Sequence, residues 1–288
     1  YQKFAAFPLI IPKYSPPLVM MCCLISTYLM CFPHQGKSMT YPFSTRNQVT
    51  KFEAIDFVPK RAMVIFAHPD DAEIGAGATA ALWAAQGCEI TYVQCTTGSS
   101  GSNDTEMTSE KIVRIRAAEQ RAAADEIGAT DIVILDHPDG ELEADRVFLS
   151  EVVHALRKYR PDVVFTHDQH RIHGFQHRDH RNVGITVQDA VYPYARDHLH
   201  FPEQLGKGIE PYKVKHVFFW GTDIPDVIVD VSDSVDTKIN ALSKHESQLP
   251  GLSFGSEMDL RMRTRHSDAA KGYGFKYGES FRRLTART

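Results

Sequence analysis

Apolar runs of strand length alternate along the chain with longer stretches of helical pattern and with turns rich in glycine, proline and aspartate. The apolar runs lack the alternation of a half-exposed strand, so they predict strands that are buried on both faces, as in a parallel sheet. Residues from Pro250 onward, rich in glycine, arginine and aromatic side chains, predict an irregular or short-helical tail. The predicted strands are 63–67, 89–95, 131–135, 162–166, 214–220 and 226–231, and the predicted helices are 73–86, 109–127, 146–159, 177–194 and 232–248.

Strands that alternate with helices at this spacing indicate βαβ units. The chain is therefore predicted to be an α/β protein, a Rossmann-like three-layer sandwich with a mostly parallel central sheet. We expect a single domain over residues 39–288, in which residues 195–288 are added to the Rossmann-like part.

An uncharged stretch, residues 17–33, stands near the N-terminus. A signal peptide is one interpretation, although no Ala-x-Ala-like cleavage site follows it. A membrane anchor is a second, although the stretch is slightly shorter than the roughly 20 apolar residues that a span requires. We favour a third, in which residues 1–38 are a non-native or signal-like extension and translation starts at Met39, because the chain begins with Tyr1.

The net charge and the positions of the cysteines bear on which partners the protein binds and in which compartment it is found. The net charge is −4, from 32 basic and 36 acidic residues, which gives no electrostatic reason to expect a nucleic-acid partner. Cys22, Cys23 and Cys31 lie in the N-terminal extension, while Cys88 and Cys95 lie in or beside one predicted strand. We expect those two to be buried thiols in a reducing compartment. This predicts a cytoplasmic protein, secreted or membrane-anchored only if the N-terminal segment is native.

Polar side chains gather directly after the predicted strands. The first strand leads into His68, Asp70 and Asp71. Because the carboxyl ends of parallel strands meet at one sheet edge, where ligands bind in open α/β sheets, these clusters should converge. Convergent histidines and aspartates predict a metal site. The other clusters are the loop 98–104 after the second strand, His137 and Asp139 after the third, and His167, Asp168, His170, His173 and the block 177–180 after the fourth.

Imidazole nitrogens with one carboxylate oxygen suit zinc, and a catalytic zinc has about three protein ligands. His68 and Asp71 can face one point across a short turn, while Asp70 diverges. His177 and His180, three residues apart, share one helical face, and either could complete the site. The spare carboxylate could take a proton from the attacking water, and the spare histidine could stabilise an oxyanion or protonate a leaving amine.

Residues 67–75, Ala-His-Pro-Asp-Asp-Ala-Glu-Ile-Gly, closely resemble the LmbE-like, or PIG-L, family of zinc-dependent de-N-acetylases. That family includes N-acetylglucosaminyl-phosphatidylinositol deacetylase and bacterial thiol-sugar deacetylases. The resemblance covers about residues 61–284. Further matches follow in family order at Thr97-Gly98, Arg116–Glu119, Pro138–Gly140, His177–His180, Lys238–Gln248 and Tyr277–Phe281.

The resemblance implies an enzyme that removes the acetyl group from a small N-acetylglucosamine-type substrate, with one Zn²⁺ per chain or another divalent metal in its place. It also assigns the roles that spacing left open. His68, Asp71 and His180 would bind the metal, Asp70 would be the general base, His177 would stabilise the oxyanion or act as acid with Asp179 orienting it, and Arg116 would reach the substrate near its acetyl group.

Two features depart from the family pattern. Arg178 replaces a proline that the family often has, although the neighbouring histidines and aspartate keep their spacing. The loop 168–176 is long and rich in histidine, and we expect it to be solvated rather than to form a second metal site through His170 and His173. His137 is expected to be a loop residue and not a ligand.

Other functions stay open at this stage. An amidase acting on a thiol-sugar conjugate would share the same chemistry, and a non-catalytic sugar- or metal-binding module could share the same fold. Gly75–Ala80 fits the Gly-x-Gly-x-x-Ala pattern of a dinucleotide-binding oxidoreductase, but its glycines fall inside a predicted helix and no ribose-binding acid follows the second strand. A homo-oligomer is possible, and a membrane partner is expected only if residues 17–33 are an anchor.

Overall fold

A computed structural model describes residues 51–206 and 208–286. The N-terminal features predicted above, namely residues 17–33, Met39 and the cysteines at 22, 23 and 31, lie outside the described residues. The expected extension over 1–38 and the single domain over 39–288 therefore stay predictions. Among the described residues, no helix has both the length and the apolar character needed to cross a bilayer.

One sheet of eight strands runs through the molecule in the order β1-β7-β8-β6-β5-β2-β3-β4. Strand β8 is antiparallel to β6 and β7, and all other neighbouring pairs are parallel. The mostly parallel sheet of the prediction is confirmed. The strands are β1 (Glu53–Ala54), β2 (Arg61–Phe66), β3 (Glu89–Thr96), β4 (Asp131–His137), β5 (Val163–His167), β6 (His216–Trp220), β7 (Val227–Asp230) and β8 (Gly278–Thr285).

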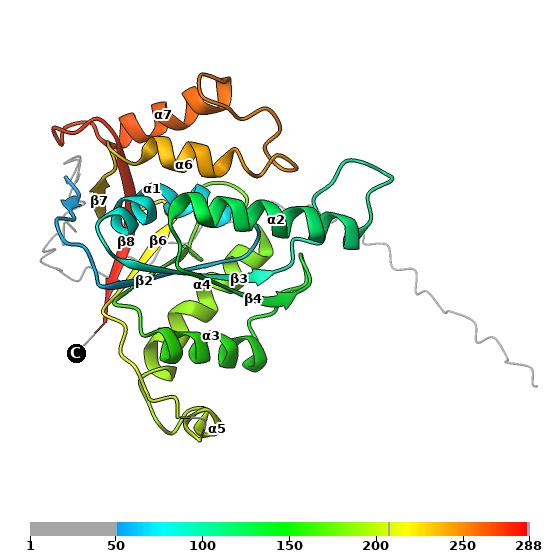
Figure 1. Ribbon diagram of the computed structural model, residues 1–288. Helices are drawn as coiled ribbons and strands as arrows, with labels where there is room; N and C mark the ends of the chain where they lie inside the picture. Colours follow the sequence, from blue (N-terminus) through cyan, green and yellow to red (C-terminus); the bar gives the residue numbers. More distant parts are fainter. Residues whose placement is uncertain (1–50, 207, 287–288) are drawn as a thin grey trace, which may run out of the picture. The chain divides into compact units, whose positions relative to one another are not determined.

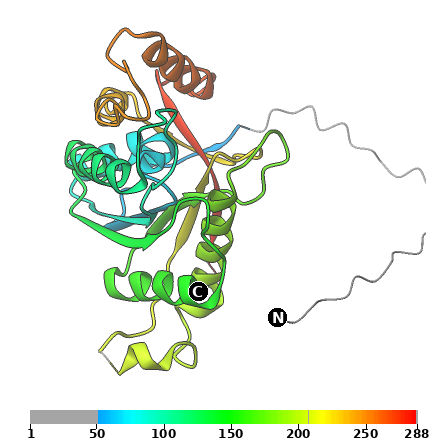
Figure 2. The ribbon, with the colours of Figure 1, turned by 90° about the vertical axis from the view of Figure 1, so that its right-hand side faces the viewer.

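Helices cover both faces of this sheet, which confirms the three-layer sandwich (Figures 1 and 2). In one layer α1 (Asp71–Ala85), α2 (Ser109–Ile127) and α6 (Val235–Leu242) pack against one another, and α7 (Glu257–Ala269) packs on β8. The other layer consists of α3 (Arg146–Tyr159), α4 (Arg178–Asp189) and the π-helical turn η1 (Ala190–Tyr194), with the short α5 (Pro202–Leu205) beyond it.

Strand β2 shows why the apolar pattern lacks alternation. Val64 and Phe66 contribute to the core beneath α1 and α6, while Met63 and Ile65 contribute to the core against α3 and α4. Successive side chains of a strand point to opposite faces, so a strand covered on both sides must be apolar throughout.

The strand order reverses at β2. From β2 the chain proceeds outward through β3 and β4, and then returns to the other side of β2 to form β5 and β6. Such a reversal opens a crevice at the carboxyl ends of the two central strands. His68 follows β2 and His167 is the last residue of β5, so both stand at this crevice.

The glycines of α1 allow close packing, as their position in the helix predicts. A Cβ atom on Gly75 would come within 2.3 Å of the Trp220 ring, and one on Gly77 would come within 3.3 Å of Lys238. Both glycines stand in the body of α1, away from the tight turn where a dinucleotide fingerprint would lie. This removes the structural basis for the oxidoreductase alternative.

The structure corrects the sequence prediction in the C-terminal third. The predicted helix 232–248 is shorter, because α6 ends at Leu242 and turns follow it. The tail is ordered, with α7 and the full strand β8. Arg282 and Arg283 break the apolar pattern of β8, but the first pairs with Asp168 and the second with Glu53. The predicted helix 177–194 is divided between α4 and η1.

Candidate metal centre and active site

The predicted metal ligands and catalytic residues lie at two places in the fold, the turn between β2 and α1 and the start of α4. His68, Asp70 and Asp71 occupy the short turn from β2 into α1, and His177 is the N-cap of α4. Asp70 has a φ of 103°, in the left-handed region that a non-glycine residue enters at a cost of about 1–3 kcal/mol. This unusual backbone lets adjacent aspartates point in different directions, as the sequence predicts for Asp70 and Asp71.

Three donor atoms form a nearly equilateral triangle at the crevice. The His68 Nδ1 atom lies 3.2 Å from Asp71 Oδ2 and 3.2 Å from His180 Nε2, and the latter two atoms are 3.1 Å apart. Zinc–ligand distances of about 2.0–2.2 Å in tetrahedral geometry place ligand atoms roughly 3.3–3.5 Å from one another. The set of two imidazoles and one carboxylate therefore fits a divalent metal both in chemistry and in spacing.

The second nitrogen of His68 faces two further carboxylates. Its Nε2 atom lies 3.1 Å from Asp139 Oδ1 and 3.1 Å from Asp179 Oδ2. Burial alone would lower the pKa of His68, but the hydrogen bonds to the surrounding carboxylates raise it to about 11. A ring that donates from Nε2 to carboxylates presents its Nδ1 lone pair to a metal, which is the usual support for a histidine ligand.

Asp179 supports His68 instead of the ring of His177. Its Oδ2 atom accepts from the backbone N–H of Gly140 at 2.7 Å as well as facing His68. Only the backbone N–H of Asp179 reaches His177, donating to Nδ1 at 3.2 Å. The orienting role that the resemblance implies thus runs through the peptide group of Asp179, while its Oδ2 atom faces His68 and the Gly140 N–H.

That backbone bond sets the tautomer of His177. Because Nδ1 accepts from Asp179, a neutral ring carries its proton on Nε2, where it can donate to an oxyanion. Burial and the nearby His68 and His180 rings lower the pKa of His177, which favours this neutral form. The His177 ring centroid is 4.5 Å from that of His68, so the donor stands directly beside the metal triangle.

Asp70 has the electrostatic surroundings of a general base. Burial and the charge of Asp71 raise its pKa to about 8, opposed by Arg116, whose guanidinium nitrogen lies 3.6 Å from Asp70 Oδ2. A cation held by the triangle would act in the same direction as Arg116 and favour the ionised form. A pKa in the neutral range suits proton transfer at physiological pH.

Arg116 is buried and ties two loops together. Its guanidinium donates to the carbonyl of Pro69 at 2.8 Å and to the carbonyls of Gly98 and Ser100 at 3.3 and 3.2 Å. Gly98 has a φ of 66°, and a Cβ there would stand 3.0 Å from Arg116. The glycine therefore allows the loop after β3 to close over the arginine beside Asp70.

A buried polar chain holds the strained peptide of Asp70. The Asp70 N–H donates to Gln120 Oε1 at 2.9 Å, and Gln120 Nε2 donates to Glu73 Oε1 at 3.0 Å. The second oxygen of Glu73 lies 3.2 Å from His245 Nε2. Gln120, Glu73 and His245 are all buried, so the base is positioned by α1, α2 and the turn after α6 together.

Sequence reasoning left Asp139, Gln120 and Glu73 without a role. The signal for Asp139 was its place after β4 at the shared sheet edge, since it now faces His68 at 3.1 Å and Arg116 at 3.6 Å. Glu73 belongs to the 67–75 motif, two residues after Asp71, and Gln120 lies on α2, one helical turn after Arg116. Their roles depend on how α1 and α2 pack, which a single sequence does not specify.

The other histidines of the predicted clusters differ in how near they lie to the metal triangle. His167 is buried, stacks on His180 with ring centroids 4.0 Å apart and forms a second possible metal-binding group with Asp71 and His180, although its Nε2 accepts from the backbone N–H of Ala67. Burial lowers the pKa of His167 to about 4. His137 binds Glu151 at 2.6 Å, and the exposed loop residues His170 and His173 are not brought into the cluster among the described residues.

The fold and this cluster define a class: Rossmann-like α/β proteins with a candidate metal centre at the carboxyl edge of a mostly parallel sheet. Residues 63–191 match the PIG-L family, described as GlcNAc-PI de-N-acetylase. The chain is 32% identical over 191 residues to a diacetylchitobiose deacetylase from Thermococcus kodakarensis, an alignment that covers 66% of this chain and 71% of the relative.

Two further comparisons agree. The chain is 31% identical over 257 residues to a 1D-myo-inositol 2-acetamido-2-deoxy-alpha-D-glucopyranoside deacetylase from Kribbella flavida, covering 66% of this chain and 83% of the relative. The solved N,N'-diacetylchitobiose deacetylase from Pyrococcus horikoshii superposes with a TM-score of 0.73 at 29% identity, covering 79% of this chain and 84% of the other. The chain belongs to the PIG-L, or LmbE-like, family of deacetylases, as its motifs indicate.

Proposed function

We propose that this protein is a zinc-dependent hydrolase that removes the acetyl group from an N-acetylglucosamine-type substrate. The observation that carries the proposal is the triangle of His68, Asp71 and His180 donor atoms, 3.1–3.2 Å apart, with the buried Asp70 beside it. Relatives named as deacetylases of diacetylchitobiose and of an acetamido-glucopyranoside support the substrate class.

His68 Nδ1, Asp71 Oδ2 and His180 Nε2 would hold the ion. A divalent metal there supplies a Lewis acid and lowers the pKa of a bound water toward about 7. The charges of His180 and His167 overcome burial and hold the pKa of Asp71 well below its usual range, so this ligand is already ionised at neutral pH.

Asp70 accepts the proton of the attacking water. Its carboxylate is available because its backbone, not its side chain, makes the hydrogen bond to Gln120. His177 donates from Nε2 to the oxygen that becomes negative as the acetamide carbonyl turns tetrahedral, which is the arrangement of an oxyanion hole. Arg116 keeps the loop and the base in place and offers positive charge near the acetyl group. The sugar amine leaves protonated, with acetate as the second product.

The alternative of an amidase on a thiol-sugar conjugate uses the same residues and differs only in the acyl group. A non-catalytic sugar-binding module would not need a base, an oxyanion donor and three metal ligands together. The retained Asp70 and His177 therefore favour catalysis over binding alone.

The direct test is the Asp70→Asn variant, with acetate release measured on N,N'-diacetylchitobiose and on N-acetylglucosaminyl-inositol. We expect one zinc per chain by elemental analysis, as in the parent, and activity lower by about 10²–10⁴-fold, because only the proton acceptor is lost. Chelation should abolish the parent's activity and zinc should restore it. Asp125→Asn, an exposed aspartate on α2, is the matched control and should retain full activity.

Full activity in Asp70→Asn would remove Asp70 from the mechanism. Acetate release that is unaffected by prolonged chelation would contradict the metal-dependent reaction itself. A different ion in the purified protein, with activity restored only by that ion, would replace zinc in the proposal and leave the residues in their roles.

A further inference from the structure

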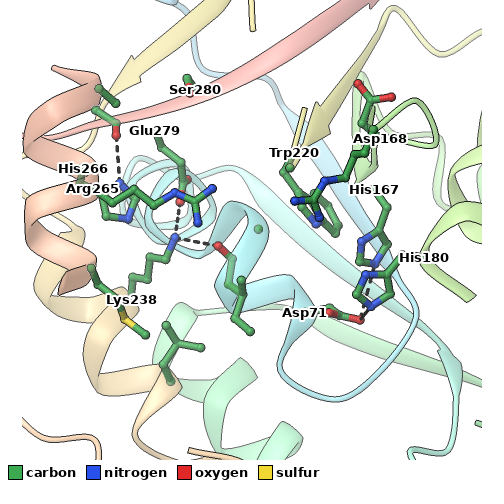
Figure 3. Close-up of a pocket in the computed structure, with 18 of the residues that line it drawn as sticks. Asp71, His167, Asp168, His180, Trp220, Lys238, Arg265, His266, Glu279 and Ser280 are labelled. Atoms are coloured by element: carbon green, nitrogen blue, oxygen red, sulfur yellow. Dashed lines mark hydrogen bonds and ion pairs between the residues drawn. The ribbon is translucent and has the colours of Figure 1, made fainter. Parts of the chain in front are cut away.

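A cavity of about 330 Å³ opens beside the metal triangle, between α1, α6, α7 and β8 (Figure 3). Asp71 and His180 line one end, and His266 and Glu279 line the other. Asp70, His177 and Arg116 do not line it. The cavity is therefore a space adjoining the reacting groups, and its volume falls within the range of small-molecule sites.

The acidic side chains that line the cavity are already neutralised. Asp168 is held by Arg282 through two bonds of 2.7 and 2.9 Å. Glu279 pairs with Lys238 at 2.7 Å and accepts from the backbone N–H of Thr79 at 2.8 Å. Asp71 belongs to the metal triangle. These carboxylates thus have no charge left to offer a ligand.

Two lining guanidinium groups, on the exposed residues Arg171 and Arg265, are not held in an ion pair by any described residue, although Asp223 lies close enough to Arg171 to interact with its charge. Within the described residues, the structure gives Arg171 and Arg265 no hydrogen bond or ion pair. Arg171 comes from the loop after β5 and Arg265 from α7, so they approach from different elements. Figure 3 shows the Arg265 side chain extending from α7 toward the middle of the cavity, on the side facing Trp220.

We propose that this cavity binds an anionic group, a carboxylate or a phosphate, attached to the N-acetylated sugar. The inference rests on the proposed deacetylase function and names the chemical class of its substrate. Guanidinium groups bind carboxylate and phosphate through charge-assisted, often bidentate hydrogen bonds. The apolar wall formed by Ile74, Leu242 and Met262 would contact the carbon chain that links the anion to the sugar.

The same reasoning explains why a neutral ligand fits less well. A wholly neutral sugar would leave both guanidinium groups to the solvent and would gain no charge-assisted bond from either of them. An anion compensates both charges in a partly enclosed space, where electrostatic attraction is screened less than at an open surface. The cavity therefore favours substrates whose sugar carries an anionic substituent, while the reaction at the metal centre requires the acetamide group.

The test uses N-acetylglucosamine β-glycosides whose aglycones end in a carboxylate, a phosphate or a neutral amide, with linkers of graded length. For the parent protein we expect kcat/KM at least about tenfold higher for an anionic conjugate than for the amide, mainly through KM. Arg171→Gln and Arg265→Gln should each lower this preference several-fold and leave kcat for the amide unchanged. The carboxylate and phosphate arms show which anion is bound.

Binding of the corresponding deacetylated glycosides, measured by calorimetry, gives a readout that does not depend on turnover. Affinity for the anionic products should fall with added salt and in both arginine variants. Arg261→Gln is the matched control, since Arg261 lies on the same helix but pairs with Glu257 outside the cavity. It should behave like the parent.

Hydrolysis without any preference for the anionic conjugates would overturn the anion site and leave the deacetylase proposal intact. A preference that persists in both arginine variants would also overturn it. If none of the conjugates is hydrolysed, the deacetylase proposal fails for this substrate class, and arginine-dependent product binding alone then decides the anion site.

Discussion

At the scale of single residues, His68 connects the two halves of the site. One ring nitrogen belongs to the donor triangle and the other faces Asp139 and Asp179, each at 3.1 Å. The negative charge that raises the pKa of this ring would equally favour a cation at Nδ1. The metal site therefore includes its supporting carboxylates, and the loops after β4 and at the start of α4 help to set its charge.

Substitution of the two histidines at the start of α4 should have different effects, one on metal binding and the other on catalysis alone. His180→Asn should lose stoichiometric metal and, with it, activity, because one corner of the triangle is removed. His177→Asn should retain metal and lose activity by about 10²–10³-fold, as expected for one oxyanion donor. Elemental analysis and acetate release on the same preparations check both outcomes.

These variants are matched, since both substitute a histidine at the start of one helix, His177 as its N-cap and His180 in its first turn. Metal loss in His177→Asn with retention in His180→Asn would move the ligand to position 177. Retention in both would point to His167, which also lies near Asp71, at 3.5 Å.

The sequence predicted the members of the triangle but not their surroundings. His68, Asp71 and His180 carry a recognisable motif, and the structure brings them together. Asp139 and Gln120 contact the site through packing of loops and helices that no local pattern encodes. The carboxylate of Asp179 was expected on His177 and is found on His68, because the backbone N–H of Asp179 already occupies the nearer nitrogen of His177.

At the scale of elements, the general base depends on helices that do not carry it. Helix α2 contributes Gln120 to the Asp70 peptide, and the turn after α6 contributes His245 to Glu73. A left-handed aspartate persists only when its surroundings hold it. Packing of α1 against α2 and α6 is thus part of the active-site geometry.

Gln120→Leu should therefore affect both stability and rate. The substitution leaves the buried Asp70 N–H and one oxygen of Glu73 without a partner, at a cost of about 1–3 kcal/mol in unfolding free energy. We expect kcat to fall at least about tenfold with metal content unchanged, since the ligands are untouched. Denaturant unfolding and single-turnover acetate release measure the two effects.

Arg121→Leu provides the control for that variant, because Arg121 is the exposed neighbour on the same helix. It should leave both quantities within error of the parent. If Gln120→Leu loses stability but retains its rate, the chain of hydrogen bonds is structural and does not position Asp70.

At the scale of the whole molecule, strands β2 to β7 could be predicted because each contains an apolar run bounded by turns, whereas the short exposed strand β1 was not predicted. The last strand could not. In β8, Arg282 forms an ion pair with Asp168, the residue after β5, and Arg283 forms one with Glu53 of β1. Both acids are far from β8 in the sequence. Charge compensation between distant segments lets a charged stretch take a place in a sheet.

The packing of α7 on β8 should make the protein sensitive to acid through His266. This buried histidine has its Nδ1 atom 2.9 Å from the carbonyl oxygen of Gly278, and burial together with Lys238 lowers its pKa to about 4. The unfolded chain binds the proton near pH 6.5 and the folded chain does not. Unfolding free energy should thus fall between about pH 6.5 and pH 4, by up to about 3 kcal/mol from this group.

His266→Asn keeps a donor for Gly278 but removes the titrating ring. The difference in unfolding free energy between parent and variant, measured in metal-stripped protein by denaturant, should therefore shrink or reverse as the pH falls from 7.5 toward 4. His198→Asn, which replaces a histidine whose side chain is 72% exposed, should show no such change. A parent–variant difference that stays constant across this range would mean that His266 is protonated as readily in the folded protein as in the unfolded chain.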